Sequence, residues 1–163
     1  MSLPDPSVAK DLDTLSRLLT LREVRYNELR AKADDIPEEE LVPPTLRLQV
    51  MIADKPQEDQ PDMLNAQVAL NVDLAVPEGR ACVEPVAFFQ IPIKYSAALN
   101  PRALTAYVNE TGFFQILPFA RQSMFDISSK VFRNPILMPI FRPGDAIFEL
   151  PPLEDDVKPR DDD

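Results

Sequence analysis

Most of the side chains that could carry acid–base or metal chemistry in this 163-residue chain are carboxylates. The chain has 27 Asp and Glu residues, no histidine and a single cysteine, Cys82. Metal sites built from His and Cys are therefore excluded, as are catalytic triads and dyads that depend on His. A carboxylate-based metal site or a pair of catalytic acids remains, and an acidic enzyme of that kind predicts pocketed acids with raised pKa.

The acids, however, occur in runs that are typical of solvated surface. The segments "PEEEL" and "EDDVKPRDDD" place like charges side by side, and the proline and basic residues of the second do not suit a calcium loop. The three glycines are isolated, so the chain has no glycine-rich phosphate loop. Cys82 has only Arg80 as a basic neighbour, which predicts a buried strand residue rather than a reactive thiol. We therefore expect no enzyme, no cofactor and no metal ligands.

Charge and composition narrow the range of partners. The net charge is −10, and nucleic acids or anionic membrane surfaces need clustered Lys and Arg. A single cysteine cannot form an internal disulfide, which agrees with a reducing compartment. The longest apolar runs, such as "VAFFQIPI", are far shorter than the roughly 20 residues that span a bilayer. The start "MSLPDPSVAKDLD" lacks the basic region and apolar run of a signal peptide. These features predict a soluble, acidic, cytoplasmic protein.

The first third of the chain predicts a short helix and a strand. Residues 1–10 have the composition of a disordered leader, and leucines at helical spacing favour a short helix over residues 10–19. An imperfect strand pattern covers residues 19–32, before the acidic, proline-bounded loop "DDIPEEELVPP". The expected organisation is a flexible leader or short helix over residues 1–16, one domain over residues 17–150, and an acidic disordered tail over residues 151–163.

Three further strands are predicted from apolar alternation. The segments "TLRLQVMI" and "LNAQVALNVDL" alternate with period two, which is typical of a sheet with one buried and one solvated face. Turn residues separate them, so an antiparallel pair is expected. A strand over residues 80–95 is apolar on both faces, with Phe89 and Ile91 on one and Phe88 on the other. Pro85 and Pro92 within it indicate bulges or an edge position.

Beyond residue 95 the pattern becomes helical. Asn100 is a suitable cap for a short helix that begins at Pro101, and Gly112 is a suitable break before a longer second helix. Pro118 is expected near the start of the regular part of that helix, because a proline inside a helix costs about 3 kcal/mol. Strands followed by helices predict an α+β fold. Its four-stranded antiparallel sheet carries a short and a long helix on one face.

The longer helix has two apolar surfaces. One continuous stripe contains Phe113, Ile116, Leu117, Ala120, Met124, Ile127 and Val131. A second ridge, about a quarter turn away, contains Phe114, Phe125 and Phe132. Burying one Phe is worth roughly 1.5–3 kcal/mol, so the ridge requires its own cover. Three covers are possible: the C-terminal segment folding back, a second subunit, or a client protein.

The segment "ALTAYVNETGFFQILPFARQSMFDISSKVFRNPILMP" resembles the C-terminal half of the SecB-type export chaperones. The run from Ile116 to Arg121, with its Leu-Pro pair, and the later run from Pro135 to Pro139 carry the resemblance. The order and spacing of the upstream strands extend it to residues 17–150.

The resemblance implies a homotetramer, a dimer of dimers, whose apolar grooves hold unfolded polypeptides and deliver them to the SecA motor. It implies neither catalysis nor nucleotide. The implied client or subunit surface is the ridge of Phe114, Phe125 and Phe132, with a second groove at Phe88, Phe89 and Ile91. SecA docking is expected at Glu28 and Glu84. Lys32 stands where the family has another acid, so docking is a weaker expectation than chaperoning.

The sequence thus leads to a hypothesis with two alternatives. The first is a holdase that keeps non-native polypeptides competent for export by the Sec translocase. Related SecB-like chaperones serve toxin–antitoxin systems, so a chaperone of an antitoxin is the second. The third is an oligomeric binding subunit that has the fold and no preference for unfolded chains.

Overall fold

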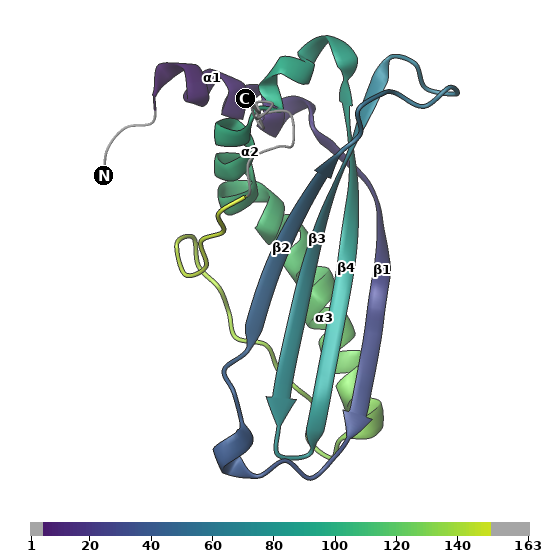
Figure 1. Ribbon diagram of the computed structural model, residues 1–163, viewed down its shortest axis with the longest axis vertical. Coiled ribbons are helices and arrows are strands. Elements are labelled where there is room, and N and C mark those ends of the chain that lie inside the picture. The colour runs from purple at the N-terminus through teal and green to yellow at the C-terminus, as the bar shows by residue number, and fades with distance from the viewer. Residues whose placement is uncertain (1–4, 151–163) are drawn as a thin grey trace, which may run out of the picture.

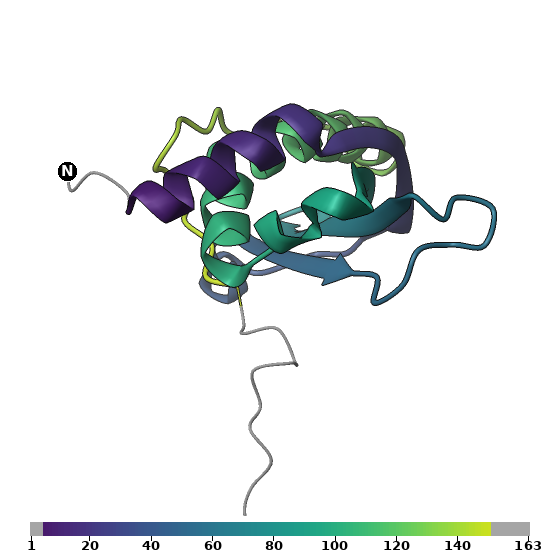
Figure 2. The ribbon, with the colours of Figure 1, turned by 90° about the horizontal axis from the view of Figure 1, so that it is seen from above.

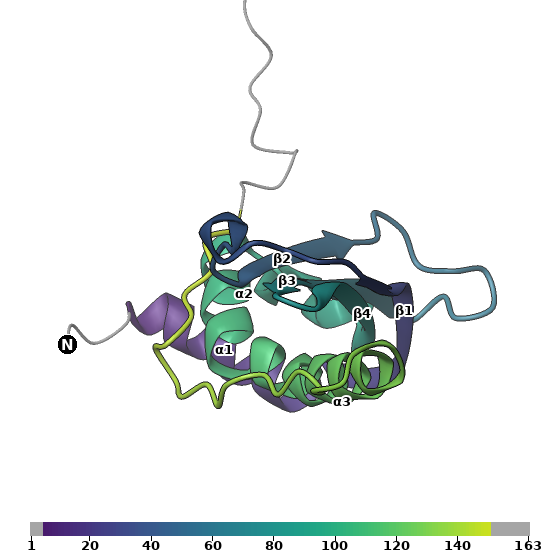
Figure 3. The ribbon, with the colours of Figure 1, turned by 90° about the horizontal axis from the view of Figure 1, so that it is seen from below.

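The computed structural model describes residues 5–150, which form one sheet with helices on a single face (Figure 1). The strands are β1 (Thr20–Ala33), β2 (Thr45–Ile52), β3 (Met63–Val76) and β4 (Gly79–Pro92). They pair antiparallel in the order β1-β4-β3-β2. The α-helices are α1 (Pro6–Leu18), α2 (Pro101–Tyr107) and α3 (Phe113–Val131), and all three lie on the same face of the sheet (Figures 2 and 3). This arrangement confirms the predicted α+β fold.

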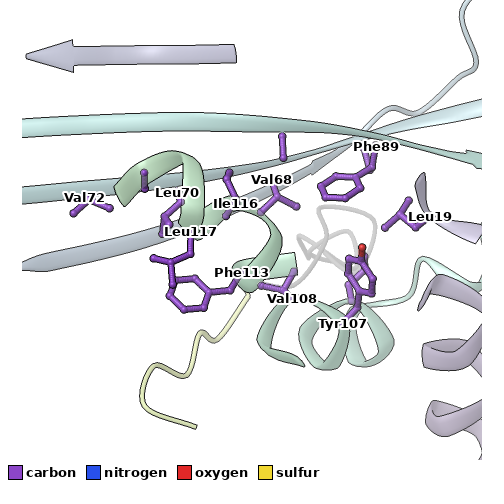
Figure 4. Packing of buried hydrophobic residues seen from close by; sticks show 14 of the residues in the cluster. Leu19, Val68, Leu70, Val72, Phe89, Tyr107, Val108, Phe113, Ile116 and Leu117 are labelled. Carbon is purple, nitrogen blue, oxygen red and sulfur yellow. The ribbon is translucent and has the colours of Figure 1, made fainter. Parts of the chain in front are cut away.

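The core lies between the helix-covered face of the sheet and α3. Alternate residues of β3, from Leu64 to Leu74, are buried, as the period-two pattern predicts. They pack against Ile116 and Leu117 of α3, and the Phe89 and Tyr107 rings meet edge to face with their centroids 6.3 Å apart (Figure 4). Burial of the Tyr107 hydroxyl raises its pKa to about 12.

The position of β4 differs from the prediction. It lies between β1 and β3, so the edge position inferred from Pro85 is wrong. Pro85 pairs with Tyr26, and the register shifts between Tyr26 and Glu28. The irregularity therefore lies in β1, which bulges opposite the residue that lacks a backbone donor. Pro92 ends the strand, and a 3₁₀ segment (Ile93–Ala98) follows it.

A tight hairpin joins β3 to β4. Gly79 opens β4 with a φ of +152°, which a residue with a side chain rarely adopts. A Cβ at this position would collide with the carbonyl oxygen of Lys32 on β1. Glycine thus allows the hairpin to approach the neighbouring strand closely.

The two C-terminal helices are continuous, which corrects the predicted break between them. Asn100 caps α2 by accepting from the Ala103 amide (3.0 Å), as expected, but Gly112 does not break the helix. A π-helical turn (Val108–Gly112) joins α2 to α3, with Gly112 in ordinary helical geometry beside the Tyr107 ring.

Pro118 lies inside α3 rather than near its start, since the helix already begins at Phe113. A proline inside a helix costs about 3 kcal/mol. The buried neighbours Ile116 and Leu117 offset that cost, because each buried aliphatic side chain contributes roughly 1.5–3 kcal/mol. Tertiary packing therefore overrides the local preference.

The N-terminal helix is longer than predicted. It begins at Pro6 rather than near residue 10, because Asp5 accepts a hydrogen bond from the Ser7 amide (3.0 Å) and Pro6 suits the first helical position. Leu15 is fully buried, and Asp11 accepts a 2.7 Å hydrogen bond from the Asn100 side chain at the start of α2. Residues 6–16, expected as a leader or short helix, are thus helical and attached to the core. Residues 1–4 and the tail predicted for residues 151–163 lie outside the described residues.

None of the helices within residues 5–150 is long and apolar enough to cross a membrane.

Candidate functional site: a groove beside the long helix

The segment after α3 folds back beside the second apolar ridge. Residues 132–150, here called the strap, run back along α3 toward α2 (Figure 1). Ile136 and Met138 of the strap are buried, and Phe141 and Phe148 pack on the Phe113 ring with centroid separations of 5.7 and 5.1 Å. The C-terminal segment therefore folds back and packs on Phe113 of the first stripe, and its residues Ile136, Met138 and Phe141 face the ridge residues Phe114 and Phe125 across an open pocket.

A few side-chain contacts fix the first part of the strap. The Glu78 carboxylate, in the turn between β3 and β4, accepts from the Arg133 amide (2.6 Å) and from the Asn134 side chain (2.9 Å). The Ser128 hydroxyl accepts from the Ile136 amide (2.8 Å), and Arg121 donates to the Met138 carbonyl (3.3 Å). These contacts bind the backbone of the strap without a sheet ladder.

A groove remains open between α3 and the strap. Its volume is 540 Å³, and its lining is mainly apolar, with Arg121 as its charged residue. The lining residues are Phe114, Leu117, Pro118, Arg121, Gln122, Phe125, Ile136, Leu137, Met138 and Phe141. Here it is called the α3 groove. An apolar trough with a few polar groups along one side suits an extended polypeptide better than a small polar substrate.

The structure separates the three members of the predicted ridge. Phe114 and Phe125 both line the α3 groove, and Phe125 is 41% exposed. Phe132 is only 5% exposed and packs against Gly79 at the β3–β4 turn. Phe114 and Phe125 thus present an open surface, whereas Phe132 belongs to the core of this chain.

The residues of the second predicted groove lie on opposite faces of the sheet, because side chains alternate along β4. Phe89 and Ile91 point into the core and are almost completely buried. Phe88 lies on the opposite face of the sheet, where the Arg25 guanidinium is 5.3 Å from its ring centroid. The three residues therefore do not line a common groove within this chain.

The two acids considered for SecA docking are brought together. Glu28 and Glu84 are direct partners across β1 and β4 on the face opposite the helices, and Glu28 accepts a 2.9 Å hydrogen bond from Arg30. The next two pairs on that face, toward the β3–β4 hairpin, contain no acid. They are Arg30 with Cys82 and Lys32 with Arg80. Asp73 of β3 pairs with Cys82 and adds a third carboxylate to this face.

Cys82 is buried on β4, as the sequence predicts. Burial raises the pKa of its thiol, and the nearby carboxylates of Glu28 and Asp73 raise it further. A protonated thiol is a poor nucleophile. Within residues 5–150, no three His, Cys, Asp or Glu side chains are grouped so that they could hold a metal ion.

The sequence did not indicate two residues that contribute polar groups beside the strap. Arg121 was named only as the end of the run that resembles the SecB-type chaperones, and Asn109 had no assigned role. The Asn109 side chain exchanges two hydrogen bonds with the backbone of Phe148, at 2.7 and 2.9 Å. Arg121 is a charged residue that follows the apolar run "ILPFA", and that signal could have marked it. Asn109 begins the polar run "NET", so no local signal marks it.

Comparison with known proteins identifies the fold. No protein-family model and no curated protein sequence matches the chain. The structure is similar to a SecB-like chaperone of Mycobacterium tuberculosis in complex with a ChAD peptide from the HigA1 antitoxin. That match has a TM-score of 0.53 and 18% sequence identity, and it covers 83% of this chain and 99% of that one. A protein of unknown function from Streptococcus agalactiae matches with a TM-score of 0.51 and 8% identity, over 75% of this chain and 97% of that one. The chain therefore has a SecB-like fold.

Proposed function

We propose that the protein is a SecB-like chaperone that holds unfolded or non-native polypeptides in apolar grooves. The observation that carries the proposal is the α3 groove, where Phe114 and the half-exposed Phe125 remain open although the strap lies beside them. Exposed aromatic surface of this kind is costly to leave in water unless a partner covers it. The function involves no chemical step and no cofactor.

The groove suits clients of varied sequence. Its apolar walls accept any bulky side chain, and Arg121 and Gln122 offer polar groups to a client backbone. The binding of an antitoxin peptide by the M. tuberculosis protein supports polypeptide clients for this fold. Affinity is expected to be broad and to depend on apolar content rather than on an exact motif.

Oligomerisation into a dimer of dimers is part of the proposal. Tyr26, Leu29 and Phe119 form an exposed apolar flank where edge strand β1 meets α3, and the Tyr26 hydroxyl lies 3.3 Å from the Phe119 carbonyl. This flank is separate from the α3 groove, so subunit contacts and client binding need not compete. The expected assembly is a cytoplasmic homotetramer.

Two roles are compatible with such a chaperone. Delivery to the Sec translocase would use Glu28 and Glu84 to dock SecA, and the pairing of these acids across β1 and β4 favours it. Protection of an antitoxin is the second role, and the antitoxin peptide in the similar structure favours that one. Binding of purified SecA to the wild type but not to Glu84→Lys would support export, and no binding to either would favour the antitoxin role.

The proposal is tested by two measurements on the purified chain. Light scattering should give the mass of a tetramer. Citrate synthase diluted from guanidinium chloride should aggregate more slowly in the presence of the protein than with an equal mass of serum albumin. A monomer that leaves aggregation unchanged would contradict the chaperone function. A stable oligomer without holdase activity would favour a binding subunit that only shares the fold.

A further inference from the structure

The end of the strap is held by two hydrogen bonds to its backbone, which do not depend on the type of side chain at that position. Asn109 lies in the π-helical turn between α2 and α3. Its Oδ1 accepts from the Phe148 amide (2.7 Å), and its Nδ2 donates to the Phe148 carbonyl (2.9 Å). A neighbouring strand makes the same two hydrogen bonds with a residue directly opposite. Asn109 can therefore hold an extended residue of any type.

The side chain of the held residue occupies an aromatic site. The Phe148 ring lies 5.1 Å from the Phe113 ring, at an interplanar angle of 49°. Phe113 is itself buried, and Phe114 and Phe141 pack on it as well, at 5.2 and 5.7 Å. This wall prefers an aromatic residue, because aromatic pairs gain energy beyond the area that they bury. Backbone and side chain together define a site for one aromatic residue in an extended chain.

The Asn109 side chain is oriented before any extended segment arrives. Its Nδ2 also donates to the Thr105 carbonyl one turn earlier, at 2.8 Å. The amide is thereby fixed with its oxygen toward the strap. A π turn costs regular helix geometry, and such turns occur frequently at functional sites.

Residues 139–150 of the strap include no fully buried side chain, and Phe141, Ala146, Phe148 and Leu150 are only partly buried against the core. Ile140 and Ile147 of the strap are 77% and 76% exposed, and Pro139, Pro143 and Gly144 interrupt it. Among the described residues, the side-chain hydrogen bonds that join residues 139–150 to the rest of the chain are the two with Asn109. Segments with few buried contacts and few backbone bonds open at low free energy. The end of the strap is therefore a replaceable occupant.

We propose that residues 141–148 are an internal ligand of a client-binding site, and that an aromatic residue of an extended client segment displaces Phe148 from Asn109 and Phe113. The inference rests on the proposed chaperone function and specifies its clients as extended segments that contain an aromatic residue. Displacement of the strap joins this site to the α3 groove, since Phe141 lines both. A longer client segment then lies along α3 in place of the strap.

The strap also sets the affinity of this site for a client segment. A site that is open only part of the time binds with an apparent Kd that is raised by the inverse of the open fraction. Weakening the internal ligand should therefore tighten the binding of an external one. We expect a gain of about tenfold, which corresponds to roughly 1.4 kcal/mol.

A peptide that copies the strap tests the proposal directly. The probe is a fluorescein-labelled synthetic peptide with the sequence of residues 142–150, "RPGDAIFEL", and the readout is fluorescence anisotropy with the full chain. The variant Phe148→Ser should bind the probe about tenfold more tightly than the wild type does. Ile147→Ser is the matched control, because it removes an exposed apolar residue next to Phe148, and it should bind the probe like the wild type.

Two further binding measurements locate the site at which the probe binds. In the double variant Asn109→Leu with Phe148→Ser, the tenfold gain in probe affinity should disappear. Circular dichroism will verify that this variant retains its helices. A probe in which the phenylalanine is replaced by serine should not bind Phe148→Ser. Equal probe affinity for the wild type and Phe148→Ser would overturn the proposal, as would undiminished binding by the double variant.

The same variants in the citrate synthase assay separate this inference from the chaperone function. If the wild type slows aggregation but the probe binds Phe148→Ser no more tightly than the wild type, the chaperone function stands and the internal ligand is refuted. If no variant slows aggregation, the chaperone function fails whatever the probe does.

Discussion

The two sides of α3 both contact aromatic residues, yet they are built differently. On the sheet side, Phe89 and Ile116 are buried under a four-stranded antiparallel sheet whose strands are joined by hydrogen-bonded ladders. On the strap side, Phe141 and Phe148 are only half-buried, and single side chains hold the backbone. Apolar content therefore does not decide which surface is permanent. The backbone partners decide it, because a ladder opens cooperatively and isolated contacts open one at a time.

The largest expected effect comes from removing one ring on each side. Phe89→Ala should lower the free energy of unfolding by about 3–5 kcal/mol, because it leaves a cavity in the core. Phe141→Ala should cost only about 1 kcal/mol, since its ring is half-buried and its main partner is Phe113. Urea denaturation at one fixed protein concentration measures both, and equal losses would show that the strap belongs to the same cooperative unit as the core.

A smaller effect is expected where the strap starts. Glu78→Ala removes the acceptor of the Arg133 amide and the Asn134 side chain, which should cost about 1 kcal/mol. Amide hydrogen exchange should become faster in residues 133–138 and stay unchanged in β3 and β4. Faster exchange throughout the sheet would mean that the strap is not separable from it. Glu40→Ala, in an exposed acidic run, is the control and should change neither region.

The sequence predicted the sheet side of this comparison well and the strap side poorly. The period-two alternation of β3 and the Asn100-Pro101 start of α2 are local signals, and both were confirmed. Pro118 and Gly112 were misread, because their local preferences for helix ends are weaker than the packing of the residues around them. The pattern also showed two apolar surfaces on α3. It could not show that Phe132 turns into the core, since that depends on its contact with Gly79 in a distant hairpin.

The strap itself has neither helical nor strand periodicity, so its course could not be predicted. Its positions are fixed by Glu78, Arg121 and Asn109, which are distant in sequence from the atoms they contact. Contacts between single polar side chains and a remote backbone leave no repeating pattern. For the same reason, the site at Asn109 was invisible before the structure, while the aromatic ridge beside it was not.

The most direct test of the central claim, that the α3 groove holds non-native polypeptides, is the citrate synthase assay with Phe125→Asp. Phe125 is half-exposed in the groove, so the change should leave the circular dichroism spectrum intact and abolish most of the delay in aggregation. Ile140→Asp adds the same charge at a more exposed apolar residue that does not line the groove, and it should act like the wild type. A Phe125→Asp protein that delays aggregation as well as the wild type would contradict the account.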